Sequence, residues 1–188
     1  MLAGCGHGVV HTLPVSRADL PPGEPLIQTL PIHEAYYHVE PDGQVTVALR
    51  YRHRSLLGPA LSAEWIMSIV VDKLPAGRER LYSLTTREVR MAQTRGLDRR
   101  RGRAVSGVLV LGAPRGGRMR GRFHAAVPQQ VFTALGGWSP AHRGSIMTTT
   151  GAFEALENPA KARAIRARTE ADGFDRPPRI TTAPATEK

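Results

Sequence analysis

Arginines are the residues of this sequence whose chemistry stands out, and they occur in two dense groups. The members of the two groups are Arg99, Arg100, Arg101 and Arg103, followed by Arg115, Arg118, Arg120 and Arg122. A guanidinium is always charged, and its planar fork of N–H donors matches the oxygens of phosphate, carboxylate and sulfate. These eight arginines are therefore the candidate anion-binding residues of the chain.

The basic charge is concentrated in one block of the sequence. The formal net charge is +10, and 23 of the 26 basic residues are arginine. Residues 76–144 hold 14 arginines against three acidic residues, a net charge of +11, whereas the remainder has a net charge of −1. One interpretation is an acidic partner. The other is a solvated face whose arginine stems cover Val108 and Val110.

No grouping of side chains predicts catalysis or a bound cofactor. The sequence contains no Gly-x-Ser-x-Gly, His-Glu-x-x-His or phosphate-binding Lys-Ser/Thr loop. A zinc site needs three or four converging ligands, and His38, His53 and His124 could converge only through an arrangement of separate strands. We therefore expect a protein that is not an enzyme, with no metal and no cofactor.

The only cysteine of the chain, Cys5, follows Leu2, Ala3 and Gly4. The string Leu-Ala-Gly-Cys resembles the lipobox of bacterial lipoproteins. The resemblance covers four residues and implies a diacylglyceryl group on Cys5, a signal peptide cut just before it, and a lipid-anchored place in the cell envelope. It predicts that upstream codons encode a hydrophobic signal. The alternative for Cys5 is a cytosolic thiol.

The distribution of prolines and of alternating residues divides the chain into four parts. Residues 6–33 hold five prolines and little periodicity, so residues 1–33 are expected to form an extended tether or a disordered terminus. Residues 34–157 are the predicted β-domain, residues 158–173 a helix, and residues 174–188 a disordered tail.

A first hairpin is predicted around Pro41, Asp42 and Gly43. Apolar residues alternate on both sides of this turn, which is typical of half-buried strands. Pro41-Asp42 suits the centre of a type I turn, and Gly43 suits the left-handed position that follows. The register that keeps one face apolar pairs Val39 with Val45 and sets Glu34 opposite Arg50.

The predicted fold is an antiparallel β-sandwich or small barrel of about six to eight strands. Its central element is a long hairpin over residues 104–127, whose second strand alternates arginines with apolar residues. A strand covered on both faces is expected at residues 64–71. The remaining expectations are strands at 80–85, 87–92 and 145–155, a basic connection at 96–103, an undecided segment at 129–135 and a loop at 136–140.

One helix is predicted at the end of the domain. Asn158 is a suitable N-cap, Pro159 fits the first helical position, and Gly173 fits just past the end. The apolar stripe is thin, with Ala162 and Ile165 as its main members. Such a helix is expected to pack loosely on the sheet or to project from it.

Two functions from different classes are compatible with the sequence. The first is a non-enzymatic, lipid-anchored envelope protein that docks a protein partner or an acidic polymer. The second is a soluble, cytoplasmic module that binds nucleic acid or another polyanion through the arginines of residues 99–122, with an affinity that falls steeply with salt.

Overall fold

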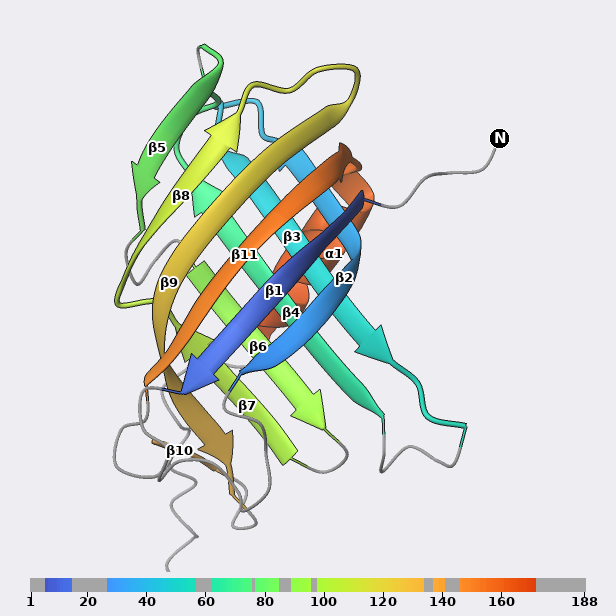
Figure 1. The fold of residues 1–188 in the computed structure, drawn as a ribbon, viewed down its shortest axis with the longest axis vertical. Helices are drawn as coiled ribbons and strands as arrows, with labels where there is room; N and C mark the ends of the chain where they lie inside the picture. Colours follow the sequence, from blue (N-terminus) through green and yellow to red (C-terminus); the bar gives the residue numbers. More distant parts are fainter. Residues whose placement is uncertain are drawn as a thin grey trace, which may run out of the picture.

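Strands make up most of the regular structure, and they close into a barrel with one helix on its outside (Figure 1). The computed structural model describes residues 6–14, 27–56, 62–75, 77–84, 89–95, 98–133, 137–140 and 146–171. The elements are β1 (Gly6–Pro14), β2 (Gln28–Val39), β3 (Val45–His53), β4 (Ala63–Val71), β5 (Glu79–Ser83), β6 (Val89–Arg95), β7 (Asp98–Arg103), β8 (Ser106–Gly112), β9 (Arg118–Phe132), β10 (Trp138–Pro140), β11 (Ile146–Glu157) and α1 (Pro159–Ala171). The predicted all-β class with a C-terminal helix is confirmed, in the form of a barrel.

Eight strands form the closed ring, in the order β1, β2, β3, β4, β6, β7, β9 and β11, with β11 pairing back onto β1. The ring can close because β9 is 15 residues long. Its first part pairs with β11 on one side and with β8 on the other, and its last part pairs with β7. β5 extends the sheet beyond β8, and β10 pairs with the far end of β9.

Both predicted hairpins are present, and the first has the expected register. Val39 pairs with Val45 and Glu34 with Arg50, and Gly43 has a positive φ of 87°. In the second hairpin, β8 pairs with β9 from Ser106 opposite Ala126 to Leu111 opposite Gly121. The alternation of side chains determined both registers, because one face of each strand is buried in the barrel.

The N-terminal part of the chain is different from the expected tether. Residues 6–14 form β1, which lies between β11 and β2, and β2 itself begins at Gln28. The prediction for these described residues of the range 1–33 is wrong. The prolines mislead because Pro14 ends β1, while Pro31 lies within β2, on the stretch that pairs with β1. Cys5 lies outside the described residues.

Two further expectations, for residues 98–103 and for the segments after Pro128, are corrected by the structure. Residues 98–103, expected as a connection, are β7, in which Gly102 faces the interior between the outward-facing Arg101 and Arg103. A Cβ at Gly102 would lie 2.3 Å from a methyl carbon of Val127, so only glycine fits there. The undecided segment after Pro128 continues β9 to Phe132, and Trp138–Pro140, expected in a loop, is β10.

The expected strands at 80–85 and 87–92 correspond to β5 and β6, which are separate elements of the sheet. β5 pairs with β8, whereas β6 pairs with β4 and β7. The tyrosine of β5, Tyr82, faces inward, and its hydroxyl donates to the carbonyl oxygen of Lys73 at 2.5 Å. β7 pairs only with the last part of β9. β5 and β8 therefore cover the interior next to the first part of β9.

Helix α1 covers the outer wall formed by β2, β3, β4 and β6. Its buried residues Ala162 and Ile165 pack with Tyr36, Ala48, Ile66 and Ala92 of these strands. The Asn158 side chain accepts a hydrogen bond from the Lys161 amide at 3.0 Å, which confirms the predicted N-cap. The expected loose packing is wrong, because polar contacts described below add to the thin apolar stripe. Gly173 and the predicted tail at 174–188 lie outside the described residues.

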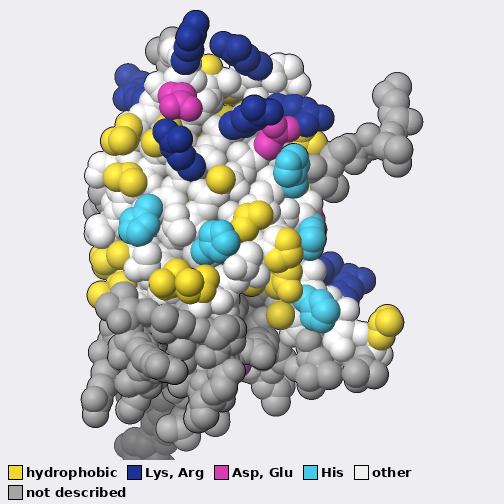
Figure 2. Space-filling view, in the orientation of Figure 1, with side chains coloured by type: hydrophobic (Ala, Val, Ile, Leu, Met, Phe, Trp, Pro, Cys, Tyr) yellow, Lys and Arg dark blue, Asp and Glu magenta, His cyan; other side chains and the backbone are white. Residues whose placement is uncertain are grey.

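The opposite wall, formed by β5, β8, β9, β11 and β1, is not covered by α1 and is the face seen in Figure 2. Its lysine and arginine side chains gather at one end, and apolar and histidine side chains lie over the middle. This exposed wall carries the second arginine group of the sequence.

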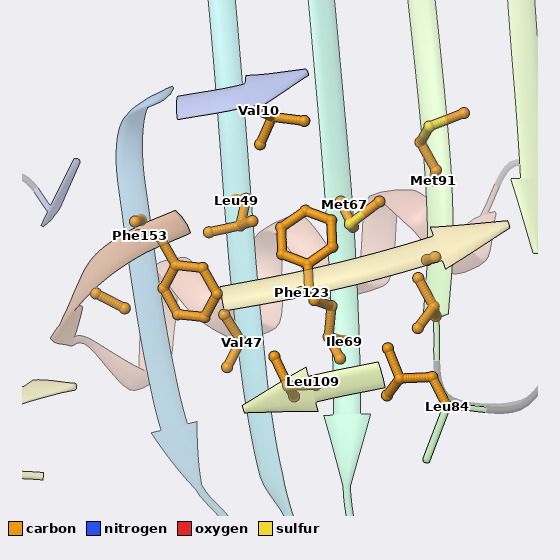
Figure 3. Close-up of a cluster of buried hydrophobic side chains, with 14 of the residues drawn as sticks. Val10, Val47, Leu49, Met67, Ile69, Leu84, Met91, Leu109, Phe123 and Phe153 are labelled. Atoms are coloured by element: carbon orange, nitrogen blue, oxygen red, sulfur yellow. The ribbon is translucent and has the colours of Figure 1, made fainter. Parts of the chain in front are cut away.

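The interior of the barrel is filled with apolar side chains from nearly every strand (Figure 3). Phe123 of β9 and Phe153 of β11 lie at its centre, with ring centroids 6.4 Å apart. Each ring faces a glycine of the neighbouring strand, because Phe123 pairs with Gly151 and Phe153 pairs with Gly121. Large and small residues therefore alternate across these two strands, which is how a narrow barrel is packed.

Candidate anion-binding surface

The tip of the long hairpin positions the second arginine group. Gly116 and Gly117 both have positive φ, 56° and 71°, and they form a two-residue loop between Arg115 and Arg118. Two successive positive φ values define the tight turn whose twist matches that of the adjoining strands. The turn therefore fixes which side chains of β9 point out of the barrel.

Alternation along β9 then sends Arg118, Arg120 and Arg122 to the outer wall. Their side chains are 58%, 84% and 70% exposed. The residues between them, Met119 and Gly121, face the core. The period of two that predicts the strand also predicts this row, so the row could be identified from the sequence.

A carboxylate of β11 holds two of these arginines. Arg118 Nη1 donates to Glu154 Oε1 at 2.5 Å, and Arg120 Nε donates to Glu154 Oε2 at 2.8 Å. The hydrogen bond from Arg120, followed by the one from Arg118, lowers the pKa of the Glu154 carboxyl. Because Glu154 is singly charged and serves two guanidiniums, the pair keeps a net positive charge.

Two arginines that sequence reasoning missed lie at the same end of the barrel: Arg80 in β5, which pairs with the inward-facing Leu111, and Arg78 just before β5. Arg78 and Arg80 are exposed, and the carbonyl oxygen of Arg78 accepts from the Ala113 amide at 3.1 Å, beside the hairpin tip. We call the arginine end the set of Arg78, Arg80, Arg115, Arg118, Arg120 and Arg122 with Glu79 and Glu154. Its six arginines against two carboxylates give a net charge of +4. The charge block at 76–144 contained the signal, but nothing in the sequence placed β5 beside β8.

The first described residues of the chain lie beside the arginine end. His7 of β1 is exposed and pairs with Glu154 of β11, the residue that binds Arg118 and Arg120. Gly6, which follows Cys5 in the sequence, pairs with Ala35 of β2 and continues β1 at the same end of the barrel. The start of β1 and the arginine end therefore share one edge of the barrel.

The first arginine group lies at the other end of β9, and the two groups do not meet. Arg100 and Arg101 pair with Val131 and Gln130 of β9, about ten residues and roughly 33 Å along the strand from Arg120. Arg101 is only 7% exposed, stacks on Trp138 at 4.2 Å and donates to Gln130 at 2.8 Å. The two arginine groups therefore form separate patches on the barrel.

The remaining members of the first group face different neighbours. Arg100 forms an ion pair with Asp98 at 2.9 Å, and Arg99 lies 5.9 Å from the centre of the Phe132 ring. Arg103 lies on the outer side of β7, in register with Arg90 of β6. Much of this group thus stabilises the junction of β7, β9 and β10, whereas the arginine end faces solvent.

The histidines considered as metal ligands lie far apart. His38 is under α1 near one end of β2, His53 ends β3 at the other end, and His124 is on the exposed wall. Within the part of the chain that the structure describes, no group of three His, Cys, Asp or Glu residues could hold a metal ion.

A polar network attaches α1 to the barrel. Arg168 binds Glu64 of β4 with two hydrogen bonds, and Arg50 donates to the same carboxylate at 2.7 Å. The Arg168 hydrogen bonds are the main cause that lowers the pKa of Glu64 to about 2. Arg163 binds Glu40 and His38 in the same manner at the start of the helix. This network occupies the wall opposite the arginine end, so it leaves that end available.

Comparison of the chain with protein-family models, with curated proteins and with solved structures gives no match. Among the described residues, no helix has the length and apolar character needed to cross a membrane.

Proposed function

We propose that this protein is a non-enzymatic, lipid-anchored β-barrel of a bacterial cell envelope that binds an acidic partner through its arginine end. The anchor is a diacylglyceryl group on Cys5, within the Leu2-Ala3-Gly4-Cys5 string that resembles a lipobox. The observation that carries the proposal is the register of β1, which sets His7 opposite Glu154. A lipid on Cys5 would hold the arginine end directly at the membrane, because the barrel begins at the next residue.

The arginine end suits an acidic partner because its arginines are exposed and outnumber its carboxylates. Arg120 and Arg122 project from the wall with most of their surface in solvent, and the set keeps a net charge of +4 after its two carboxylates are counted. Guanidinium forks form paired hydrogen bonds with phosphate and carboxylate.

The test is the intact mass of the protein from its native cells, combined with detergent phase partitioning. The expected result is a chain that begins at Cys5, carries the mass of a diacylglycerol, and enters the detergent phase. The Cys5→Ser variant should stay in the aqueous phase. An unmodified wild-type chain beginning at Met1 in the aqueous phase would overturn the lipid anchor.

One observation favours the second candidate, a module that binds single-stranded nucleic acid. Phe132 and Trp138 lie edge to face at 5.3 Å on the outer side of β9 and β10, with Arg99 and Arg101 beside them. Bases stack on exposed aromatic rings next to arginine, and Phe132 is 38% exposed. Binding of an oligonucleotide that is lost in Phe132→Ala and falls steeply with salt would support this function.

A further inference from the structure

We propose that the exposed wall formed by β5, β8, β9, β11 and β1 binds anionic lipid bilayers, with lipid phosphate as the partner of the arginine end. The inference rests on the anion-binding role proposed above and names its ligand. It concerns the barrel surface itself and does not require the lipid on Cys5.

A row of apolar residues runs across this wall, directly beside the arginine end. The strand registers place Leu81 of β5 beside Val110 of β8, Val110 beside Arg122 of β9, Arg122 beside Ala152 of β11, and Ala152 beside Val9 of β1. Leu81 is 65% exposed and Val9 is 42% exposed. Apart from Arg122, every member of this row is apolar.

The charged and apolar rows lie close together on the wall, so one flat partner can contact both. Arg120 and Arg122 are two residues apart on one strand, so neighbouring rows are about 7 Å apart. An element that lies in a membrane interface buries its apolar side chains roughly 5–10 Å into the boundary of headgroups and acyl chains. Arginine stems are long enough to reach the phosphates from beside that boundary.

The apolar row distinguishes a bilayer from a soluble polyanion. A polyphosphate or a nucleic acid backbone would use the guanidiniums but would leave Leu81 and Val9 in water. A bilayer removes these side chains from water and binds the arginines at the same time. Helix α1 covers the opposite wall, whereas this wall presents both rows to solvent within the part of the chain that the structure describes.

The position of β1 adds to the argument. Because His7 lies opposite Glu154, a lipid on Cys5 and the arginine end would act on the same side of the barrel. A diacylglyceryl group supplies two acyl chains, and a basic patch adds attraction to anionic headgroups. The two together would hold the barrel on its side, with the wall of Figure 2 toward the membrane.

Vesicle flotation with the purified, unacylated full chain tests the inference. We expect the chain to float with vesicles of about three parts phosphatidylcholine to one part phosphatidylglycerol, and not with phosphatidylcholine alone. Binding should fall steeply as salt is raised from about 0.05 M to about 0.5 M, because surface charges become screened.

Two pairs of matched variants locate the contact. Arg120→Ser with Arg122→Ser should weaken the partition coefficient about tenfold or more, whereas Arg52→Ser with Arg54→Ser, which removes two exposed arginines of β3 and its end, should have little effect. Leu81→Ser should weaken binding about threefold to tenfold, whereas Leu56→Ser, at a fully exposed position, should not. All six substituted residues are exposed, and unchanged circular dichroism and melting temperature verify that each variant is folded.

The outcomes separate this inference from the proposed function. Equal loss in both members of a pair, or binding of heparin or single-stranded DNA without binding of anionic vesicles, would overturn the lipid-binding wall. That result would leave the anchor at Cys5 intact if the native mass shows acylation. Conversely, vesicle binding by a protein that is never acylated in its cells would overturn the anchor and support the wall.

Discussion

Arg168 of α1 and Glu64 of β4 face each other as a bidentate pair, with Nη1 donating at 2.9 Å and Nη2 at 2.5 Å. The carboxylate also receives a hydrogen bond from Arg50, which is 17% exposed and also forms an ion pair with Glu34 at 3.3 Å. Glu64 thus connects the last turns of the helix to two strands of the barrel.

Neutralising Glu64 is expected to loosen this attachment. Glu64→Gln should lower the free energy of unfolding by about 1–2 kcal/mol in a urea titration at neutral pH, since it removes the charge shared by two arginines. Glu170→Gln, which affects only the more exposed pair with Arg166 within the helix, should cost no more than about 0.5 kcal/mol. Equal losses in the two variants would contradict a special role of Glu64.

The same carboxylate predicts a dependence of stability on pH. Arg168, then Arg50, lowers the pKa of Glu64 to about 2 in the folded protein, whereas an unfolded Glu titrates near about 4.3. Because the folded pKa is the lower one, the stabilisation is complete above the unfolded value and is lost as the pH falls from about 4.3 through about 2. Urea midpoints at several pH values should therefore fall more steeply in this window for the wild type than for Glu64→Gln.

Gly121 is expected to tolerate no side chain. A Cβ there would lie 2.4 Å from Cζ of Phe153 and 2.8 Å from a methyl carbon of Leu111. Gly121→Val should cost about 1–3 kcal/mol in a urea titration through overpacking, whereas Gly77→Ala, with nothing within 4 Å, should not. Combining Gly121→Val with Phe153→Leu should recover part of the loss, and purely additive losses would exclude a direct clash.

The N-cap of α1 offers a third test of stability. Asn158→Ala removes the acceptor of the Lys161 amide and should cost about 1 kcal/mol, with faster hydrogen exchange in the first helical turn. Asn158→Asp should be as stable as the wild type or more so, since its negative charge suits a helix start without acidic residues. An Asp variant as unstable as the Ala variant would exclude the capping role.

Removing Glu154 should strengthen anion binding, the opposite of removing an arginine. Glu154→Gln keeps the size of the side chain and raises the net charge of the arginine end from +4 to +5. We expect vesicle partitioning to rise about threefold or more at low salt. Glu79→Gln serves as the comparison. It makes the same change in net charge at a carboxylate that is 63% exposed and whose nearest oxygen lies 3.7 Å from a nitrogen of Arg122. Weaker binding in Glu154→Gln would mean that Glu154 is needed to orient Arg118 and Arg120.

Period-two alternation made much of this fold predictable. It determined the hairpins at Gly43 and at Gly116-Gly117, and it assigned Arg118, Arg120 and Arg122 to one face. It failed where glycine takes inner positions of a strand. Residues 98–103 and 6–14 are of this kind, since Gly102, Gly6 and Gly8 replace the apolar partners that a pattern needs.

The composition of the arginine end could be predicted only in part. The hairpin arginines follow from local alternation, but Arg78 and Arg80 join them through the pairing of β5 with β8. The closeness of His7 and Glu154 depends on a contact between residues far apart in the sequence. Local patterns carry no information on such long-range pairings, because these are selected by the closing of the whole barrel.

The pairing of β1 with β11 has a consequence for the order in which this protein can fold. Residues 7–14 find their partners at residues 147–154, so both edges of the ring stay open until nearly the whole chain has been synthesised. Contacts of such high sequence separation slow folding and leave strand edges exposed to other chains meanwhile. A nascent chain released early would lack its closing strand. For this protein, closure of the barrel therefore waits until residues 147–154 have left the ribosome.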